Sequence, residues 1–143
     1  MKSTEQNGFI EAWERSSPFL ADALARGGSA FALEDVRKDV EDEVAIFYPI
    51  ENGAAVFRVA QYPQRKLLRI WLFGGVTGTG RANLEAVMEA ADFHADLYEC
   101  DGIEVTGRRG WEKVLKPFGY EYREVTLVKE LPGAGVTEGE SHG

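Results

Sequence analysis

The sequence predicts an α+β fold in which helices cover both faces of a mixed, mostly antiparallel central sheet. Three short strand-like segments follow one another with only tight turns between them, which is typical of an antiparallel meander. A long amphipathic segment comes next, and after it the pattern is strand, short helix, strand. Because such a step needs a parallel crossover, we expect a three-layer α/β/α arrangement around a mixed sheet.

Residues 9–43 are expected to form helices ahead of the sheet. Apolar residues recur at helical spacing from the start, and the pattern is reset at Ser17 and Pro18. A serine can cap a helix and a proline suits its first position, so we predict a new helix there. The glycines at 27–28 end it, and apolar residues at helical spacing over 33–40 predict a further helix.

The meander is predicted to consist of strands at 44–50, 54–62 and 67–73, joined by turn residues. The Gly-rich stretch 74–80 then predicts a turn that leads into the longest helix of the chain. Its buried stripe is expected to comprise Leu84, Val87, Met88, Ala91, Ala95 and Tyr98.

The predicted sheet is completed by a strand from 103 to 105 or 106, a short helix over about 109–116, and a strand at 122–130. We therefore expect one domain over residues 1–131, with the sheet and its helices at 44–131. Residues 132–143 are polar and Gly-rich, which predicts a flexible tail.

Composition and charge argue against several classes of function. The chain has 143 residues, of which 44% are apolar, and a net charge of −8. Neutralisation of phosphates drives nucleic-acid binding, so no nucleic-acid partner is expected for an acidic chain. No apolar run is long enough to cross a bilayer, and the first residues lack a secretion signal, so we expect a soluble protein inside the cell, with no membrane partner.

The basic residues are concentrated in two segments. Residues 61–81 carry four basic side chains and no acidic one, whereas residues 82–104 carry seven acidic and no basic ones. The second basic segment contains Arg108, Arg109, Lys113 and Lys116. Each segment could hold one small anionic ligand, or could be a solvated face balanced by nearby acids. The single cysteine and the two isolated histidines predict no metal site.

Three local motifs narrow the interpretation of this fold. They are QYPQRK at 61–66 before the strand LLRIWLFGG, Cys100 ahead of an Ile-Glu strand, and GRRGW at 107–111 followed by Leu115, Gly119 and Tyr120. The order and length of the elements resemble the GNAT fold of the Gcn5-related N-acetyltransferases. Over about residues 30–131, the motifs resemble the small GNAT-like proteins of tailed bacteriophages and prophages.

This resemblance implies acetyl-CoA as cofactor, held between two strands with its pyrophosphate on the turn that opens the long helix. A helix N-terminus supplies aligned N–H donors and partial positive charge for such an anion. The residues assigned to the cofactor in this way are Phe73, Gly74, Gly75, Gly78, Gly80, Arg81, Arg108 and Arg109. Gly75 stands where the family has Arg or Gln, and Arg81 could replace that cation. Alternatively, the glycines only make a mobile loop.

The resemblance also implies attack of a substrate amine on the thioester carbon, assisted by a general acid and a general base. Many family members carry the acid, a tyrosine, at the position of Leu115, and leucine cannot donate a proton. Tyr120 or Tyr122 could substitute for that acid, although Tyr120 also suits a core position. Glu104 and Glu99 are the candidate bases, or else solvent-facing residues.

Two hypotheses about function follow from these residues and motifs. The first is an N-acetyltransferase-like enzyme that takes acyl-CoA and an amine as substrates in the cytoplasm of a host bacterium. The second is a non-catalytic virion or assembly protein that uses the GNAT scaffold to contact virion or assembly partners. A fold alone does not choose between them.

Overall fold

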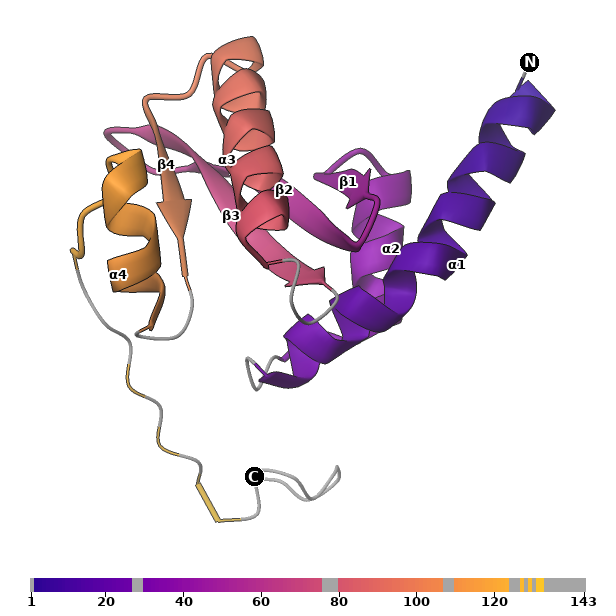
Figure 1. Ribbon diagram of the computed structural model, residues 1–143, viewed down its shortest axis with the longest axis horizontal. Coiled ribbons are helices and arrows are strands. Elements are labelled where there is room, and N and C mark those ends of the chain that lie inside the picture. Colours follow the sequence, from indigo (N-terminus) through magenta and orange to yellow (C-terminus); the bar gives the residue numbers. More distant parts are fainter. Residues whose placement is uncertain are drawn as a thin grey trace. The chain divides into compact units, whose positions relative to one another are not determined.

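The structure is a computed structural model that describes residues 2–26, 30–75, 80–106, 110–123, 127, 129, 131 and 132. The chain divides into two compact units, Met1–Trp111 and Glu112–Gly143. The elements of the first unit are α1 (Lys2–Arg26), α2 (Leu33–Glu41), β1 (Ala45–Ile50), β2 (Gly53–Gln61), β3 (Lys66–Gly75), α3 (Gly80–Leu97) and β4 (Gly102–Val105) (Figure 1). The boundary between the units falls at α4 (Gly110–Leu115), which continues into the 3-10 helix η1 (Lys116–Phe118). The single domain expected over residues 1–131 stays a prediction.

The four described strands form one sheet in the order β1-β2-β3-β4. β1 pairs with β2 and β2 with β3 in antiparallel fashion, as expected for a meander. β4 then pairs with β3 in parallel, after the crossover through α3. The prediction of a mixed, mostly antiparallel sheet is therefore confirmed.

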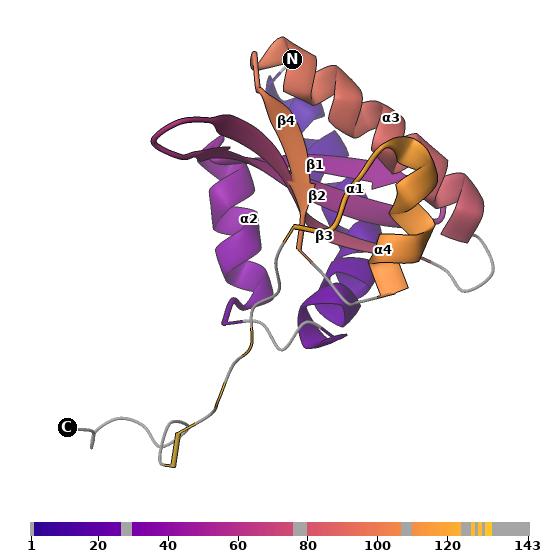
Figure 2. The ribbon, with the colours of Figure 1, turned by 90° about the vertical axis from the view of Figure 1, so that its left-hand side faces the viewer.

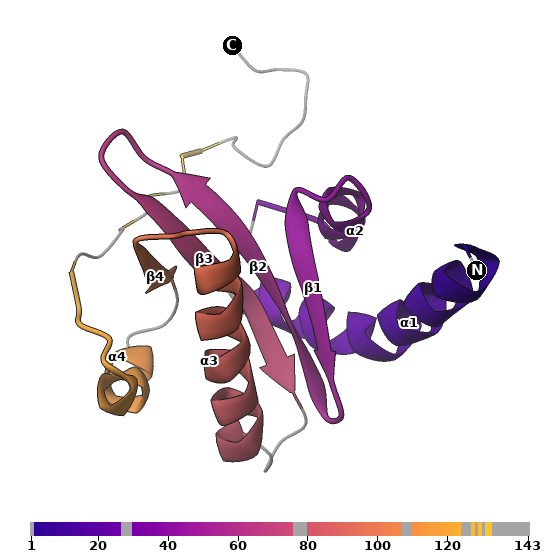
Figure 3. The same ribbon diagram turned by 90° about the horizontal axis from the view of Figure 1, so that it is seen from above.

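Helices cover both faces of this sheet, which confirms the three predicted layers. α3 lies on one face and α1 and α2 lie on the other (Figures 2 and 3). Phe57 of β2 is fully buried under α3, where its ring lies 5.6 Å from that of His94. The neighbouring residue Val56 points to the opposite face, as successive residues of a strand do. There it joins a core cluster that includes Leu20 of α1 and Val36 of α2.

A β-bulge interrupts the pairing of β2 with β3. Val56 pairs with Leu72 and the next residue, Phe57, pairs with Ile70, so Trp71 is the extra residue of β3. Such a bulge bends the strand and increases its local twist. It also allows Trp71 and Leu72 to contact the same face, where Leu72 is part of the core cluster and Trp71 packs against it.

α1 corrects the sequence-based expectation of two helices, because it continues without a break through Pro18. A proline inside a helix leaves the carbonyl four residues earlier without its N–H partner. Here that carbonyl belongs to Glu14, and the Ser17 hydroxyl donates a hydrogen bond to it at 3.3 Å. A buried stripe also runs across the proline and consists of Trp13, Ser16, Leu20 and Leu24. Packing of this stripe stabilises one continuous helix.

Two further expectations differ from the structure. The predicted strand at 122–130 is not present in its described residues, since Tyr122, Arg123, Leu127 and Lys129 lie outside any helix or strand. In the long helix, five of the six residues of the predicted stripe are buried, but Tyr98 is exposed and follows the end of α3. A backbone N–H bond from Tyr98 to the His94 carbonyl belongs to the terminating turn.

Gly74 should tolerate no side chain, because a Cβ at this position would lie 2.5 Å from the Phe19 carbonyl oxygen of α1. We expect Gly74→Ala to lower the free energy of unfolding by about 2 kcal/mol through overpacking. Gly8→Ala is the matched control, since Gly8 lies in α1 with nothing within 4 Å of an added Cβ. It should raise that free energy by up to about 1 kcal/mol, because glycine weakens a helix. Urea denaturation measures the free energy of unfolding of both variants. Equal changes in the two would contradict the close approach of α1 to Gly74.

Candidate acyl-CoA site at the parting of two parallel strands

β3 and β4 are paired over only four residues of each strand. The paired stretch runs from Leu67 with Gly102 to Ile70 with Val105. β3 continues to Gly75, whereas β4 ends at Val105. In the described part of the chain, no strand pairs with this edge of β3 beyond Ile70. The two strands therefore part at Trp71, directly ahead of the connection to α3.

Three of the predicted cofactor residues lie on β3 beyond this point. Phe73 is partly buried and pairs with Ala55 of β2. Gly74 faces α1, as described above. Gly75 approaches α3 instead, because an added Cβ would lie 2.5 Å from the Asn83 side-chain nitrogen. Close packing thus explains why Gly74 and Gly75 carry no side chain. The cofactor role of all three residues stays a prediction.

The start of α3 holds two more of the predicted residues. Gly80 is the first residue of the helix, and Arg81 follows in its first turn. The Arg81 guanidinium forms an ion pair with Glu85 at 3.2 Å, with 78% of its side chain exposed. An exposed pair of this kind contributes little, so Arg81 can still pair with a ligand phosphate. Gly78, Arg108 and Arg109 lie outside the described residues.

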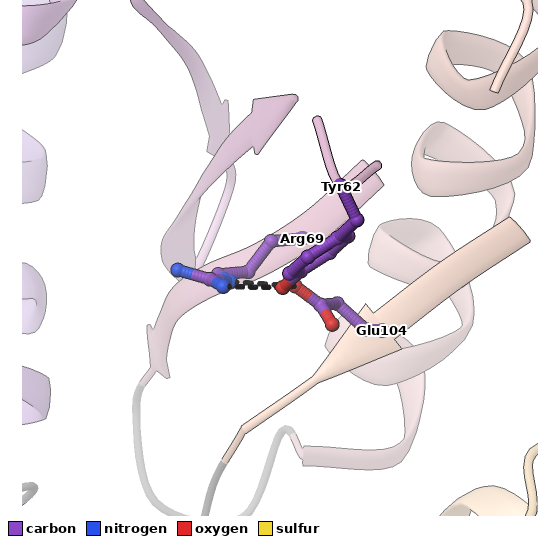
Figure 4. Close-up of polar contacts among 3 residues, drawn as sticks. All are labelled: Tyr62, Arg69 and Glu104. Atoms are coloured by element: carbon purple, nitrogen blue, oxygen red, sulfur yellow. Dashed lines mark hydrogen bonds and ion pairs between the residues drawn. The ribbon is translucent and has the colours of Figure 1, made fainter. Parts of the chain in front are cut away.

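Glu104, the predicted base, belongs to a cluster with Tyr62 and Arg69 just before the strands part (Figure 4). Arg69 of β3 lies in register with Glu104 of β4 and donates from Nε to its Oε2 at 2.8 Å. The Tyr62 hydroxyl donates to the same oxygen at 2.8 Å and accepts a bond from Nη2 of Arg69, also at 2.8 Å. We call these three residues the Tyr–Arg–Glu cluster. It joins both strands to the turn between β2 and β3.

The cluster fixes the charge of its arginine. Partial burial lowers the pKa of Arg69, but the hydrogen bonds that it donates to Glu104 and Tyr62 and the negative potential of these two groups raise it by more, so the net pKa lies above its usual value. Within the described part of the chain, the second carboxylate oxygen of Glu104 accepts no hydrogen bond. Glu104 is therefore held through one of its two carboxylate oxygens. Its role as a base stays a prediction.

The sequence pattern places Glu104 and Arg69 in separate segments and indicates no role for Tyr62. The missing information is the register of the parallel pair, which sets Arg69 opposite Glu104. The one available signal is that Glu104 is the only acidic residue of its short strand, next in the sheet to a basic one.

Tyr120, the predicted acid, belongs to the second unit. It follows Gly119, whose φ of 93° is the left-handed conformation that ends η1. The Tyr120 N–H donates to the carbonyl of Leu115 at 3.4 Å, and Leu115 is buried, with 3% of its surface exposed. Glu104 lies in the first unit. The structure therefore describes the two candidate catalytic residues separately, and the acid role of Tyr120 stays a prediction.

The described residues offer neither a metal-binding cluster nor a membrane-spanning helix. Within them, His, Cys, Asp and Glu side chains do not gather in groups of three that could hold a metal ion. No described helix is both long enough and apolar enough to span a membrane.

The Tyr–Arg–Glu cluster should stabilise the sheet more than an exposed ion pair does. We expect Glu104→Gln to lower the free energy of unfolding by about 1 kcal/mol, because a half-buried charged hydrogen bond is weakened. Glu85→Gln removes the exposed partner of Arg81 and should change it by less than about 0.5 kcal/mol. Denaturant unfolding of both variants measures the difference, and equal effects would show that the cluster adds nothing to the sheet.

Solved structures match this fold, whereas no protein-family model and no curated protein matches the sequence. A probable acetyltransferase superposes with a TM-score of 0.65 at 10% identity, over 86% of this chain and 93% of that one. An acetyltransferase of Trypanosoma brucei superposes with a TM-score of 0.57 at 10% identity, over 69% and 78% of the two chains. Neither structure points to a bacteriophage origin. The chain thus has a GNAT-like α+β fold with a mixed four-stranded sheet.

Proposed function

We propose that this protein transfers an acyl group from an acyl-CoA to an amine. The observation that carries the proposal is the parting of β3 and β4 after Ile70 in a GNAT-like fold. The edge of β3 beyond this residue has no strand partner among the described residues, so its backbone can bind a ligand. α3 begins five residues after β3 ends, and a helix N-terminus favours a pyrophosphate.

The reaction would proceed through a tetrahedral intermediate at the thioester carbon. The amine nitrogen forms a bond to this carbon, and a backbone N–H of β3 near Phe73 stabilises the oxyanion. Collapse of the intermediate breaks the C–S bond, and the thiolate of CoA takes a proton from a general acid, for which Tyr120 stays the candidate from the sequence. The nitrogen loses its proton to the free carboxylate oxygen of Glu104. Alignment of the two substrates lowers the barrier further.

A second candidate function is that of a non-catalytic virion or assembly protein of a phage or prophage. Leu115 favours it, because this residue is buried and cannot act as the acid that the family carries there. Gly75 favours it too, since it packs against Asn83 where the family has a cation. Mass spectrometry of purified particles tests this alternative, and absence of the protein from them would count heavily against it.

Isothermal titration with acetyl-CoA and CoA tests the enzyme hypothesis. We expect both to bind with a dissociation constant of about 10–100 μM, within the usual range for substrates. Arg81→Glu should weaken binding about tenfold, because it places a negative charge beside the pyrophosphate.

Lys38→Glu is the matched control for this titration. Lys38 lies on α2, its side chain is 76% exposed, and it pairs with Asp42 one helical turn away, as Arg81 pairs with Glu85. Its substitution should leave the dissociation constant within about twofold of the original value. Absence of binding at about 1 mM acetyl-CoA would reject the enzyme hypothesis.

A further inference from the structure

We propose that the amine acceptor carries an oxyanion, a carboxylate or a phosphate, and that Arg58 and Arg69 bind it. This inference rests on the proposed function and names the class of its second substrate. The two arginines lie directly opposite each other on β2 and β3. Cross-strand partners share a face of the sheet and place their Cβ atoms about 5 Å apart. Like charges in such a pair repel each other, so each arginine needs negative charge nearby.

Each arginine has one acidic neighbour, but the two are not equally engaged. Arg69 is hydrogen bonded to Glu104 within the Tyr–Arg–Glu cluster. Arg58 lies 3.8 Å from an Asp39 oxygen of α2, which is too far for a hydrogen bond. Its side chain is only 29% exposed. In the described part of the chain, the Arg58 guanidinium donates no hydrogen bond to any residue. It is thus charged and largely enclosed, with an ion pair to Asp39 but no hydrogen bond among the described residues.

Aromatic packing holds the Arg58 guanidinium in place. Its Cζ lies 4.9 Å from the centroid of the Trp71 ring, a cation–π contact. The Trp71 ring in turn meets Phe31 edge to face at 5.1 Å. Most buried donors in proteins have partners, so a positioned guanidinium that makes no hydrogen bond to the described residues is preorganised for an oxyanion. Water satisfies these donors when no ligand is bound.

Arg69 can contribute the second half of the site. Its Nε and Nη2 are used within the cluster, whereas Nη1 makes no hydrogen bond to the described residues. One end of its guanidinium points away from both Tyr62 and Glu104 (Figure 4). A carboxylate or phosphate has enough oxygens to accept from both arginines at once.

The position of this arginine pair separates it from the cofactor. Arg58 and its neighbour Trp71 lie on the face covered by α1 and α2, whereas α3, at whose start we expect the pyrophosphate, covers the other face. Arg69 is also the residue before Ile70, the last residue of β3 that pairs with β4. A small ligand anchored here would therefore have its amine beside the parted strands, where the acyl group is expected.

Titration by nuclear magnetic resonance tests this inference without any CoA. The probes are glycine, aminomethylphosphonate and glycinamide, which pair an amine with a carboxylate, a phosphonate and no anion, respectively. Glycine or aminomethylphosphonate should shift the Trp71 indole N–H signal and the Nε–H signals of Arg58 and Arg69. The probe that binds more tightly identifies the oxyanion as a carboxylate or a phosphate. Glycinamide should not shift them. Arg58→Gln should weaken this binding at least about tenfold.

Arg37→Gln is the matched control for this substitution. Arg37 pairs with Glu41 at 3.0 Å and lies over the Phe9 ring at 5.6 Å, but it has no arginine opposite. Its substitution should leave the dissociation constant unchanged. Arg58→Lys keeps the positive charge but lacks the planar set of guanidinium N–H donors, so it should bind the probes with intermediate affinity. This variant provides the test if Arg58→Gln does not fold.

Three outcomes would overturn the inference: no shift at about 50 mM of either anionic probe, equal shifts with glycinamide, or undiminished binding by Arg58→Gln. These results are independent of the cofactor titration. Anion binding without acetyl-CoA binding would reject the proposed enzyme but leave the arginine site. Acetyl-CoA binding without anion binding would reject the arginine site alone.

Discussion

The bulge at Trp71 is the constraint on which the rest of this structure depends. One extra residue in β3 changes which side chains face each layer, so that Trp71 and Leu72 contact the same side. Leu72 completes the core against α1, while Trp71 supports the guanidinium of Arg58 and packs against Phe31. The bulge also falls where β4 ceases to pair with β3, so the bend and the parting of the strands coincide.

The two faces of β3 consequently have different chemistry. Toward α3, its side chains are apolar, since Leu68 and Ile70 are both buried opposite residues of β2 that share that face. Toward α1 and α2, Arg69 alternates with them and meets Glu104. A guanidinium at the middle of a sheet costs desolvation free energy unless it is paired, and Glu104 with Tyr62 provides that pairing.

Elements with a strong local period could be predicted from the sequence, whereas features set by register could not. The stripe of α3 and the three strands of the meander follow from periods of 3.6 and 2, and both were confirmed except for Tyr98 at the end of the stripe. Pro18 was wrongly expected to start a helix. The carbonyl that it leaves without an N–H partner accepts a hydrogen bond from the Ser17 side chain instead, and a helical period does not reveal such a bond. The Tyr–Arg–Glu cluster depends on which residue of β4 lies opposite Arg69, and no local pattern contains that information.

An oxyanion site on the α1 and α2 face has a consequence for the reaction. A cofactor on the α3 side and an acceptor on the opposite side would meet where β3 and β4 cease to pair, because the described strands are otherwise paired along their neighbours. The short pairing of β4 would then be required for activity rather than being a defect of the sheet. The carboxylate oxygen of Glu104 that accepts no hydrogen bond from the described residues belongs to β4, which ends one residue later.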